Sequence, residues 1–214
     1  MRLGKQVAQC LCRGREFECI LRAPCHIHHP LSIMSIGFKE WTLICDALGR
    51  GEQSIILRKG GIAEGRAGFR FQHEEFLLFP TLFHEQVSKL KLPAETPLPG
   101  RPADGQIEIC YQARVEWTQD ITDLDVVRRL APFHLWRDEV IEERFRYDEK
   151  QGVSLAMVRM FRLSEPFIFP DAPKYGGCRS WVTLPDLPPT TQLEPVLDDA
   201  AHEEKQRQIR KALG

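Results

Sequence analysis

The sequence predicts an α+β fold: one compact domain in which a mixed, largely antiparallel sheet is flanked by helices. Apolar runs typical of strands lie on either side of segments with helical spacing, and one of these strands alternates as in a sheet covered on one face. The 214 residues, 43% of them hydrophobic, suffice for a single sizeable core. The order of elements is also compatible with a sheet curled into a barrel-like module.

Charge and composition restrict the classes to which the chain can belong. Its 29 basic and 30 acidic residues give a formal net charge of -1, so only a local basic patch could attract nucleic acid. No apolar run has the length of a membrane span, and charged residues interrupt the N-terminal segment where a signal peptide needs an apolar core. We therefore expect a cytoplasmic protein with no membrane partner and with free thiols.

Residues 1–33 differ in composition from the rest. They hold four of the seven cysteines and three of the seven histidines, and Met34 follows them directly. These side chains are potential zinc ligands, but no CxxC pair is present to grip the ion from a tight turn, so we expect no metal site. We expect a poorly ordered extension, or upstream sequence with translation beginning at Met34. A domain over 34–184 follows, and then 185–214, a proline-rich stretch with a charged helix over 198–213.

The first part of the domain is predicted to contain a helix, a strand and a strand-to-helix junction. Between Phe38 and Leu48 apolar residues recur at helical spacing, and a glycine follows as a stop signal. The run SIILR at 54–58 predicts a strand buried on both faces. Residues 69–79 have an extended pattern, and Pro80 is suited to open a helix that continues to about residue 90.

The second part contains the clearest strand. Residues 106–117 alternate apolar and polar side chains, with only Cys110 interrupting the pattern. A capping box formed by Thr122 and Asp125 predicts a short helix, and a second helix is expected over 134–145. Residues 153–163 predict a central strand in the same sheet as 106–117, and 178–184 a further strand.

Three motifs are similar to those of a known family. They are LRKGGI at 57–62, HEEFLLFPTLFH at 73–84 and YGGCRSW at 175–181. Together they resemble a bacterial family named domain of unknown function 1802, over about residues 37–184. Members of that family occur joined to restriction-endonuclease domains, which implies a nucleic-acid or defence context by association.

The turn after the buried strand is a candidate anion site. Arg58 and Lys59 precede two glycines, so two cations and backbone N–H groups could converge on a phosphate. The spacing is not that of a phosphate-binding loop, and an ordinary tight turn with solvated charges is the alternative.

The strand-to-helix junction carries two histidines. His73 and His84, with Thr81 between them, could perform acid–base chemistry because histidine titrates near neutral pH. The alternative is that His84 packs against the helix and His73 flanks the strand. As metal ligands the two lack a third partner at a recognisable spacing.

Arg159 interrupts the most apolar strand. A buried guanidinium must be paired, so we favour a structural ion pair with Glu108 or Glu116 over contact with a phosphate or a base edge. Near the C-terminal motif, Cys178 could act as a nucleophile with His134 as its base, although a buried small apolar role is more common. Tyr175 and Trp181 are core or rim aromatics that could stack on a base.

These observations favour a non-catalytic binding module over an enzyme, because no carboxylate cluster of metal-nuclease type is present. We expect nucleic acid or a partner nuclease as the binding partner and no cofactor, and the oligomeric state stays open. The alternative is a hydrolase or phosphoesterase that uses His73 and His84 beside Lys59. The candidate residues are expected to lie on one side of the domain, where glycine-rich loops expose backbone donors.

Overall fold

The computed structural model describes residues 35–59, 69–82, 85–98 and 105–214, and these belong to one structural unit. The predictions for residues 1–33, including the start at Met34, and for His84 concern residues outside this description. The unit contains a seven-stranded mixed sheet flanked by helices, which confirms the predicted α+β class. Strands β1 and β3 are parallel, and every other pair is antiparallel.

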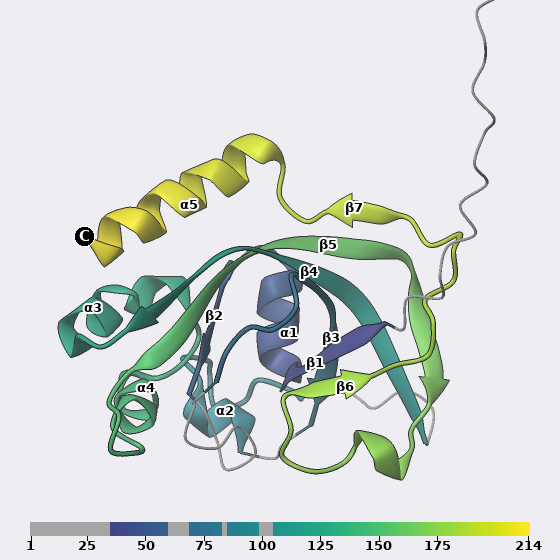
Figure 1. The fold of residues 1–214 in the computed structure, drawn as a ribbon, viewed down its shortest axis with the longest axis horizontal. Helices are drawn as coiled ribbons and strands as arrows, with labels where there is room; N and C mark the ends of the chain where they lie inside the picture. The colour runs from purple at the N-terminus through teal and green to yellow at the C-terminus, as the bar shows by residue number, and fades with distance from the viewer. Residues whose placement is uncertain (1–34, 60–68, 83–84, 99–104) are drawn as a thin grey trace, which may run out of the picture. The chain divides into compact units, whose positions relative to one another are not determined.

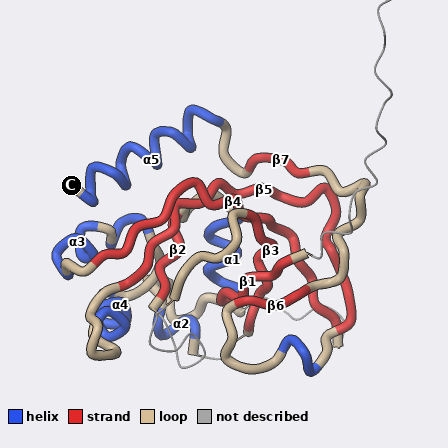
Figure 2. Tube along the Cα trace, in the orientation of Figure 1, coloured by secondary structure: helices blue, strands red, loops and turns tan. Residues whose placement is uncertain are grey.

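The sheet is open rather than closed into a barrel, so the barrel-like alternative is wrong (Figure 2). Its order is β2-β5-β4-β3-β1-β6, and β7 pairs with β5 beyond the end of β2. The strands are β1 (Ile36–Trp41), β2 (Ile55–Arg58), β3 (Glu75–Thr81), β4 (Gln106–Ile121), β5 (Val153–Pro170), β6 (Trp181–Thr183) and β7 (Leu193–Pro195).

Helices lie against several parts of the sheet. Helix α1 sits in the hollow of the bent sheet, while α3 and α4 lie together beside one end of β4 and β5 (Figure 1). The helices are α1 (Thr42–Gly49), α2 (Gln86–Lys89), α3 (Leu124–Arg129), α4 (Asp138–Phe145) and α5 (Asp199–Leu213). Short 3-10 turns cover Ala131–Phe133 and Pro173–Tyr175. No helix among these residues is long and apolar enough to cross a membrane.

Two apolar clusters form the core. The larger joins α1, the IILR strand β2 and the first half of β5 to residues from α3, α4 and α5. The smaller lies where β3, β4 and β5 meet the turn at Pro173–Tyr175, and its members are Leu77, Phe79, Ile109, Leu163, Phe169, Tyr175, Val182 and Leu184. Because successive strand residues face opposite sides, the two clusters cover opposite faces of β3.

Two predicted helices differ from the structure. Phe38 belongs to strand β1, and the helix begins only at Thr42, because β1 finds a strand partner on each side. Pro80 does not open a helix either: it lies within β3, paired with Glu40, and the helix that follows is a single turn. Local spacing and proline preference are both overridden by strand pairing.

The long strands β4 and β5 are neighbours in one sheet, as predicted, and pair from Gln106 with Pro170 to Ile121 with Val153. Both extend beyond their predicted ends. The register shifts between Ile109 and Tyr111, which is where Cys110 interrupts the sequence alternation. Such a bulge bends a strand and redirects its side chains.

The C-terminal helix α5 packs on the outer side of β4 and β5. Its apolar side is narrow, as the sequence indicates, yet Ile209 is buried and belongs to the larger core cluster. His202 is also buried, with Nε2 at 2.9 Å from a carboxylate oxygen of Glu116. The Asp198 side chain accepts a hydrogen bond from the backbone N–H of Ala201 and so begins the helix.

Candidate binding site between strands β3 and β4

Strands β3 and β4 pair over three positions and then separate. Their register runs from Glu75 with Arg114 to Leu77 with Gln112, and no further pair joins them in the described part of the chain. Beyond that point β3 pairs only with β1, and β4 only with β5. Pro80, which has no N–H to donate, lies in the segment of β3 that has left β4.

A cavity of about 770 Å³ lies where the two strands separate. Its walls come from both strands, from α1 and from the turn after β5. The lining residues are Lys39, Thr42, Cys45, Asp46, Phe79, Pro80, Thr81, Leu82, Gly105, Gln106, Ile107, Glu108, Cys110, Tyr111, Asp171, Ala172, Pro173, Tyr175 and Gly176. No histidine is among these described residues.

One side of the cavity carries a cation. The Lys39 ammonium donates a hydrogen bond to the carbonyl oxygen of Gly177 at 3.0 Å and lies 6.0 Å from the centre of the Phe79 ring. Burial, and then the positive charge of Arg179, lowers the pKa of Lys39, while Cys178 and Asp171 act in the opposite direction. This end combines two cations, one carboxylate and the aromatic residues of the smaller core cluster.

The α1 side carries acceptors and thiols. Burial raises the pKa of Asp46, and the positive charge of Arg50 partly offsets this effect. Burial and, second to it, the negative charge of Glu108 raise the pKa of Cys110 to about 11. Burial likewise raises the pKa of the Tyr111 phenol. Several pKa shifts that have burial as their largest cause occur together in this cavity. Such groups of shifted pKa values are typical of functional sites.

The start of α1 is fixed by hydrogen bonds to the end of β3. The Thr81 hydroxyl donates to the carbonyl oxygen of Glu40 at 2.9 Å, and the Thr42 hydroxyl donates to the carbonyl oxygen of Thr81 at 3.1 Å. The buried Gln86 side chain donates to the same Thr81 oxygen and accepts from the backbone N–H of Leu43. These bonds fix one wall of the cavity. The hydroxyl groups of Thr42 and Thr81 both donate within it.

Two predicted site residues, Thr81 and Tyr175, line this cavity. Tyr175 is buried against Phe79, with ring centres 5.7 Å apart. Cys178 is exposed and lies near Lys39, whose pKa it influences. His134, its predicted base, is influenced instead by Lys91 and Asp138, so the structure provides no Cys178–His134 pair.

Two other predicted residues, Arg58 and Trp181, contact the Phe38 ring of the larger core cluster, and a third, His73, contacts Trp181. The Arg58 guanidinium carbon lies 4.6 Å from the centre of the Phe38 ring, and the Trp181 ring lies 4.8 Å from it. His73 packs edge-on against Trp181, at 4.9 Å between ring centres. Arg58 also forms an ion pair at 3.5 Å with Glu40, which is only 1% exposed. The positive charge of Arg58 is therefore paired inside the protein.

Lys59 and Arg159 lie elsewhere. Lys59 forms an ion pair with Asp148 at 3.0 Å, so it does not extend an anion site with Arg58. Arg159 forms its ion pair with Asp199 of α5, and the predicted partners Glu108 and Glu116 are wrong. The partner differs because helix α5 brings the exposed carboxylate of Asp199 to Arg159 on the outer face of the sheet. The candidate residues therefore lie in separate places.

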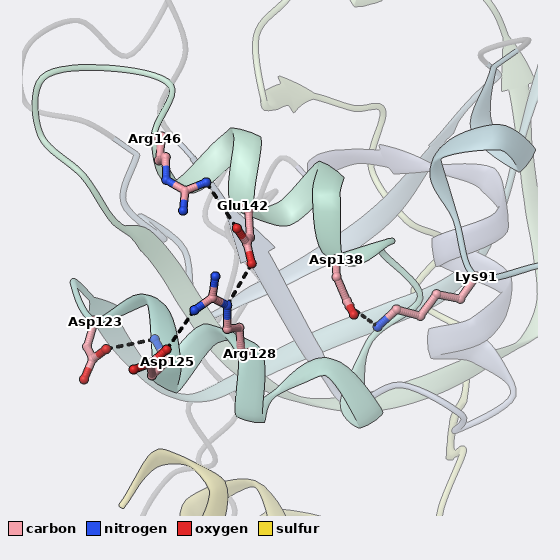
Figure 3. A network of polar contacts seen from close by, with 7 residues as sticks. All are labelled: Lys91, Asp123, Asp125, Arg128, Asp138, Glu142 and Arg146. Carbon is pink, nitrogen blue, oxygen red and sulfur yellow. Dashed lines mark hydrogen bonds and ion pairs between the residues drawn. The ribbon is translucent and has the colours of Figure 1, made fainter.

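A dense group of charges lies between α3 and α4. Figure 3 shows that these side chains pair with one another, Arg128 bridging Asp125 and Glu142. Arg146 adds a second contact to Glu142 at 3.1 Å, and Lys91 pairs with Asp138 at 2.8 Å. The group joins neighbouring helices and leaves little charge for a ligand.

A family model described as domain of unknown function (DUF1802) matches residues 37–208. The chain belongs to this family. The DUF1802 match extends beyond the predicted limit at Leu184 and includes most of α5. No curated protein matches the sequence.

Three solved structures are similar to this DUF1802 chain. They are crystal structures of ASCH from Zymomonas mobilis and of two point mutants of that protein. Sequence identity is 9%, 10% and 10%, with TM-scores of 0.39, 0.38 and 0.37. The alignments cover 81%, 82% and 81% of this chain and 94%, 96% and 96% of those chains.

Sequence reasoning missed most of the DUF1802 cavity. Lys39 and Asp46 lie in the segment predicted as one helix, and Glu108 and Tyr111 in a strand whose bulge was not foreseen. Two signals were present. The break in alternation at Cys110 marks the bulge, and a proline inside an apolar strand marks an edge without a pairing partner.

Proposed function

We propose that this DUF1802 chain is a non-catalytic nucleic-acid-binding module in which the cavity between β3 and β4 accepts one unstacked base. The observation that carries this proposal is the cavity itself. Its volume of about 770 Å³ falls within the range of small-molecule sites. Three aromatic residues, Phe79, Tyr111 and Tyr175, contribute to its walls. Aromatic side chains stabilise unstacked bases by stacking, whatever the sequence.

The Lys39 side suits the phosphate that accompanies such a base. Lys39 lines the cavity, Arg179 lies near enough to influence its pKa, and the Lys174 ammonium lies 4.9 Å from the centre of the Tyr175 ring. These three cations supply the local positive charge that a chain of net charge -1 needs for contact with nucleic acid. Asp171 opposes them, so we expect moderate affinity with marked salt dependence.

The hydrolase alternative has less support. It requires His73 to act beside Lys59, but His73 packs on Trp181 and Lys59 pairs with Asp148. Within the described residues, no lining hydroxyl or thiol contacts a histidine, so the cavity lacks a nucleophile–base pair. A partner nuclease in a restriction or defence context, which the family resemblance implies, stays part of the proposal.

A cavity-filling variant tests the site. Ile107 lines the cavity, so Ile107→Trp would place an indole where the base is proposed to lie. We expect labelled single-stranded DNA or RNA to bind wild type and to bind this variant about tenfold or more weakly, since stacking contributes roughly 1–3 kcal/mol per base. Fluorescence anisotropy at two salt concentrations measures this.

The matched control is Leu193→Trp. Leu193 lies on β7, is 36% exposed, pairs with Leu163 and does not line the cavity, so its replacement should leave binding unchanged. Circular dichroism confirms that both variants fold. Equal affinity of wild type and Ile107→Trp, or binding of no nucleic acid by wild type, would overturn the proposal. Electrophoresis of the recovered oligonucleotide tests the non-catalytic part, which cleavage would contradict.

A further inference from the structure

Two carboxylates of the cavity form no ion pair with a described residue, although Arg50 acts on Asp46 at longer range. Asp46 on α1 and Glu108 on β4 are both half-buried and both line the cavity. Neither forms an ion pair with any lysine, arginine or histidine that the structure describes. The side-chain hydrogen bond recorded for Glu108 comes from the Cys110 thiol, at a sulfur–oxygen distance of 3.5 Å. A thiol is a weak donor, so it satisfies little of the carboxylate's capacity.

Other carboxylates with reduced exposure in this protein are paired. Glu40, 1% exposed, lies beside Arg58, and Glu142, 22% exposed, accepts from two arginines. Removing a carboxylate from water without a donor is costly, so half-buried unpaired examples need another source of donors. Among the residues that the structure describes, Asp46 and Glu108 have no such donor, so a ligand in the cavity or water within it can supply one.

The position of the two carboxylates within the cavity limits what the donor can be. Asp46 and Glu108 both lie near enough to Cys110 to raise its pKa, whereas the charged groups that act on the pKa of Lys39 are Arg179, Cys178 and Asp171. A ligand that fits both sides therefore carries negative charge at one end and N–H donors at the other. No group of three potential metal ligands exists among the described residues, which leaves an organic donor as the better match.

A nucleotide has this polarity if its base carries an exocyclic amino group. Carboxylate side chains accept from the amino group of cytosine, and adenine presents a similar amino donor. Uracil and thymine present a carbonyl oxygen at the equivalent position, which two carboxylates would repel. Resting on the function proposed above, we propose that Asp46 and Glu108 make the cavity selective for bases with an exocyclic amino group, such as adenine and cytosine, over uracil and thymine.

The experiment compares short RNA oligomers of adenine, cytosine or uracil by fluorescence anisotropy. Wild type should bind the adenine or the cytosine oligomer about tenfold more tightly than the uracil oligomer, the scale of one well-formed base contact. The double variant Asp46→Asn/Glu108→Gln keeps side-chain size but presents amide donors. It should lose most of this preference, mainly because its affinity for uracil rises.

Asp171→Asn is the matched control, because Asp171 lines the same cavity on the Lys39 side. An asparagine oxygen can still accept the hydrogen bond from the backbone N–H of Ala172 that Asp171 now accepts at 2.8 Å. This variant should bind every oligomer more tightly and keep the wild-type preference.

Equal affinity of wild type for all three oligomers, or an unchanged preference in the double variant, would overturn the selectivity while leaving nucleic-acid binding in place. Binding of none of the oligomers would instead overturn the proposed function, and this inference with it. Melting curves of each variant separate loss of binding from loss of folding.

Discussion

The ring of Tyr111 lies against Gly49, so closely that a methyl group at position 49 would fall 2.1 Å from a ring carbon. The Arg162 guanidinium carbon lies 5.3 Å from the ring centre, and Arg162 also donates to the Gly49 carbonyl oxygen at 3.4 Å. Strand β5 and helix α1 thus hold between them an aromatic wall of the cavity.

Replacing Gly49 by alanine should displace that wall. The added methyl group would overlap the ring, so we expect Gly49→Ala to lower the free energy of unfolding by about 1–3 kcal/mol, the usual cost of overpacking. Urea denaturation measures the change. In a Tyr111→Ala background the same substitution should cost much less, because the ring is gone. An equal cost in both backgrounds would contradict the contact.

Arg58 should be important for stability. Its partner Glu40 is 1% exposed, so Arg58→Met would leave a buried carboxylate without its cation. We expect a loss of about 3–5 kcal/mol in the free energy of unfolding. The double variant Glu40→Gln/Arg58→Met, which removes both charges of the pair, should be more stable than Arg58→Met alone. If the single variant is as stable as wild type, the pair is not structural.

Arg159→Met should have a smaller effect than Arg58→Met. Its partner Asp199 is 82% exposed and can be solvated when the arginine is removed. The Arg159 guanidinium lowers the pKa of Asp199, so the variant should also raise that pKa, which NMR titration can follow. A loss of stability as large as that of Arg58→Met would show that the contact with α5 matters more than its exposure indicates.

His134 should make stability depend on pH. Burial, and then the positive charge of Lys91, lowers the pKa of His134 from 6.5 to about 4. The unfolded chain therefore binds a proton that the folded protein does not, and stability should fall as the pH drops from about 6.5 towards about 4. Each pKa unit corresponds to about 1.36 kcal/mol, so the full loss is on the order of 3 kcal/mol.

The variant His134→Phe isolates this contribution, because other groups also titrate in that range. Urea denaturation midpoints of the variant, measured at about pH 7 and about pH 5, should differ less than those of wild type. The same pH dependence in both proteins would show that His134 is not the group responsible.

Thiol reactivity should differ between the cavity and the surface. Burial, and then Glu40, raises the pKa of Cys45, and the pKa of Cys110 is about 11, so both thiols stay protonated at neutral pH. Cys178 is exposed. Because the thiolate is the reactive form, iodoacetamide should modify Cys178 well before Cys45 and Cys110, as measured by peptide mass spectrometry. Cys110 reacting as fast as Cys178 would contradict the burial of the cavity thiols.

The elements that sequence predicted best are those whose patterns are repeated over many residues. The alternation from Gln106 onward and the apolar run from Val153 identified β4 and β5, and their pairing followed from the need to cover two apolar faces. Strand β1 was missed because two of its residues, Phe38 and Trp41, continue the helical spacing of the segment that follows. Only its two partner strands, distant in sequence, decide between the two.

The cavity was less predictable than the fold. Thr81 and Tyr175 were named because they lie in conspicuous motifs, and both line it. Arg58 was predicted as a ligand-binding residue because of its charge, but that charge is paired with Glu40. The carboxylates Asp46 and Glu108 have no motif around them, and what distinguishes them is the absence of a described cation partner. That property depends on the folded arrangement of side chains and cannot be predicted from the sequence.

The pairing of β2 with β5 has a consequence for how the chain is made. Ile55 lies opposite Met157, so β2 has no strand to join until synthesis has passed the first residues of β5. During that interval the apolar run of β2 stays unpaired, a condition that favours aggregation and recognition by chaperones. Refolding of the complete chain should therefore be slow for its size, and the yield of soluble protein should depend on how fast ribosomes reach β5.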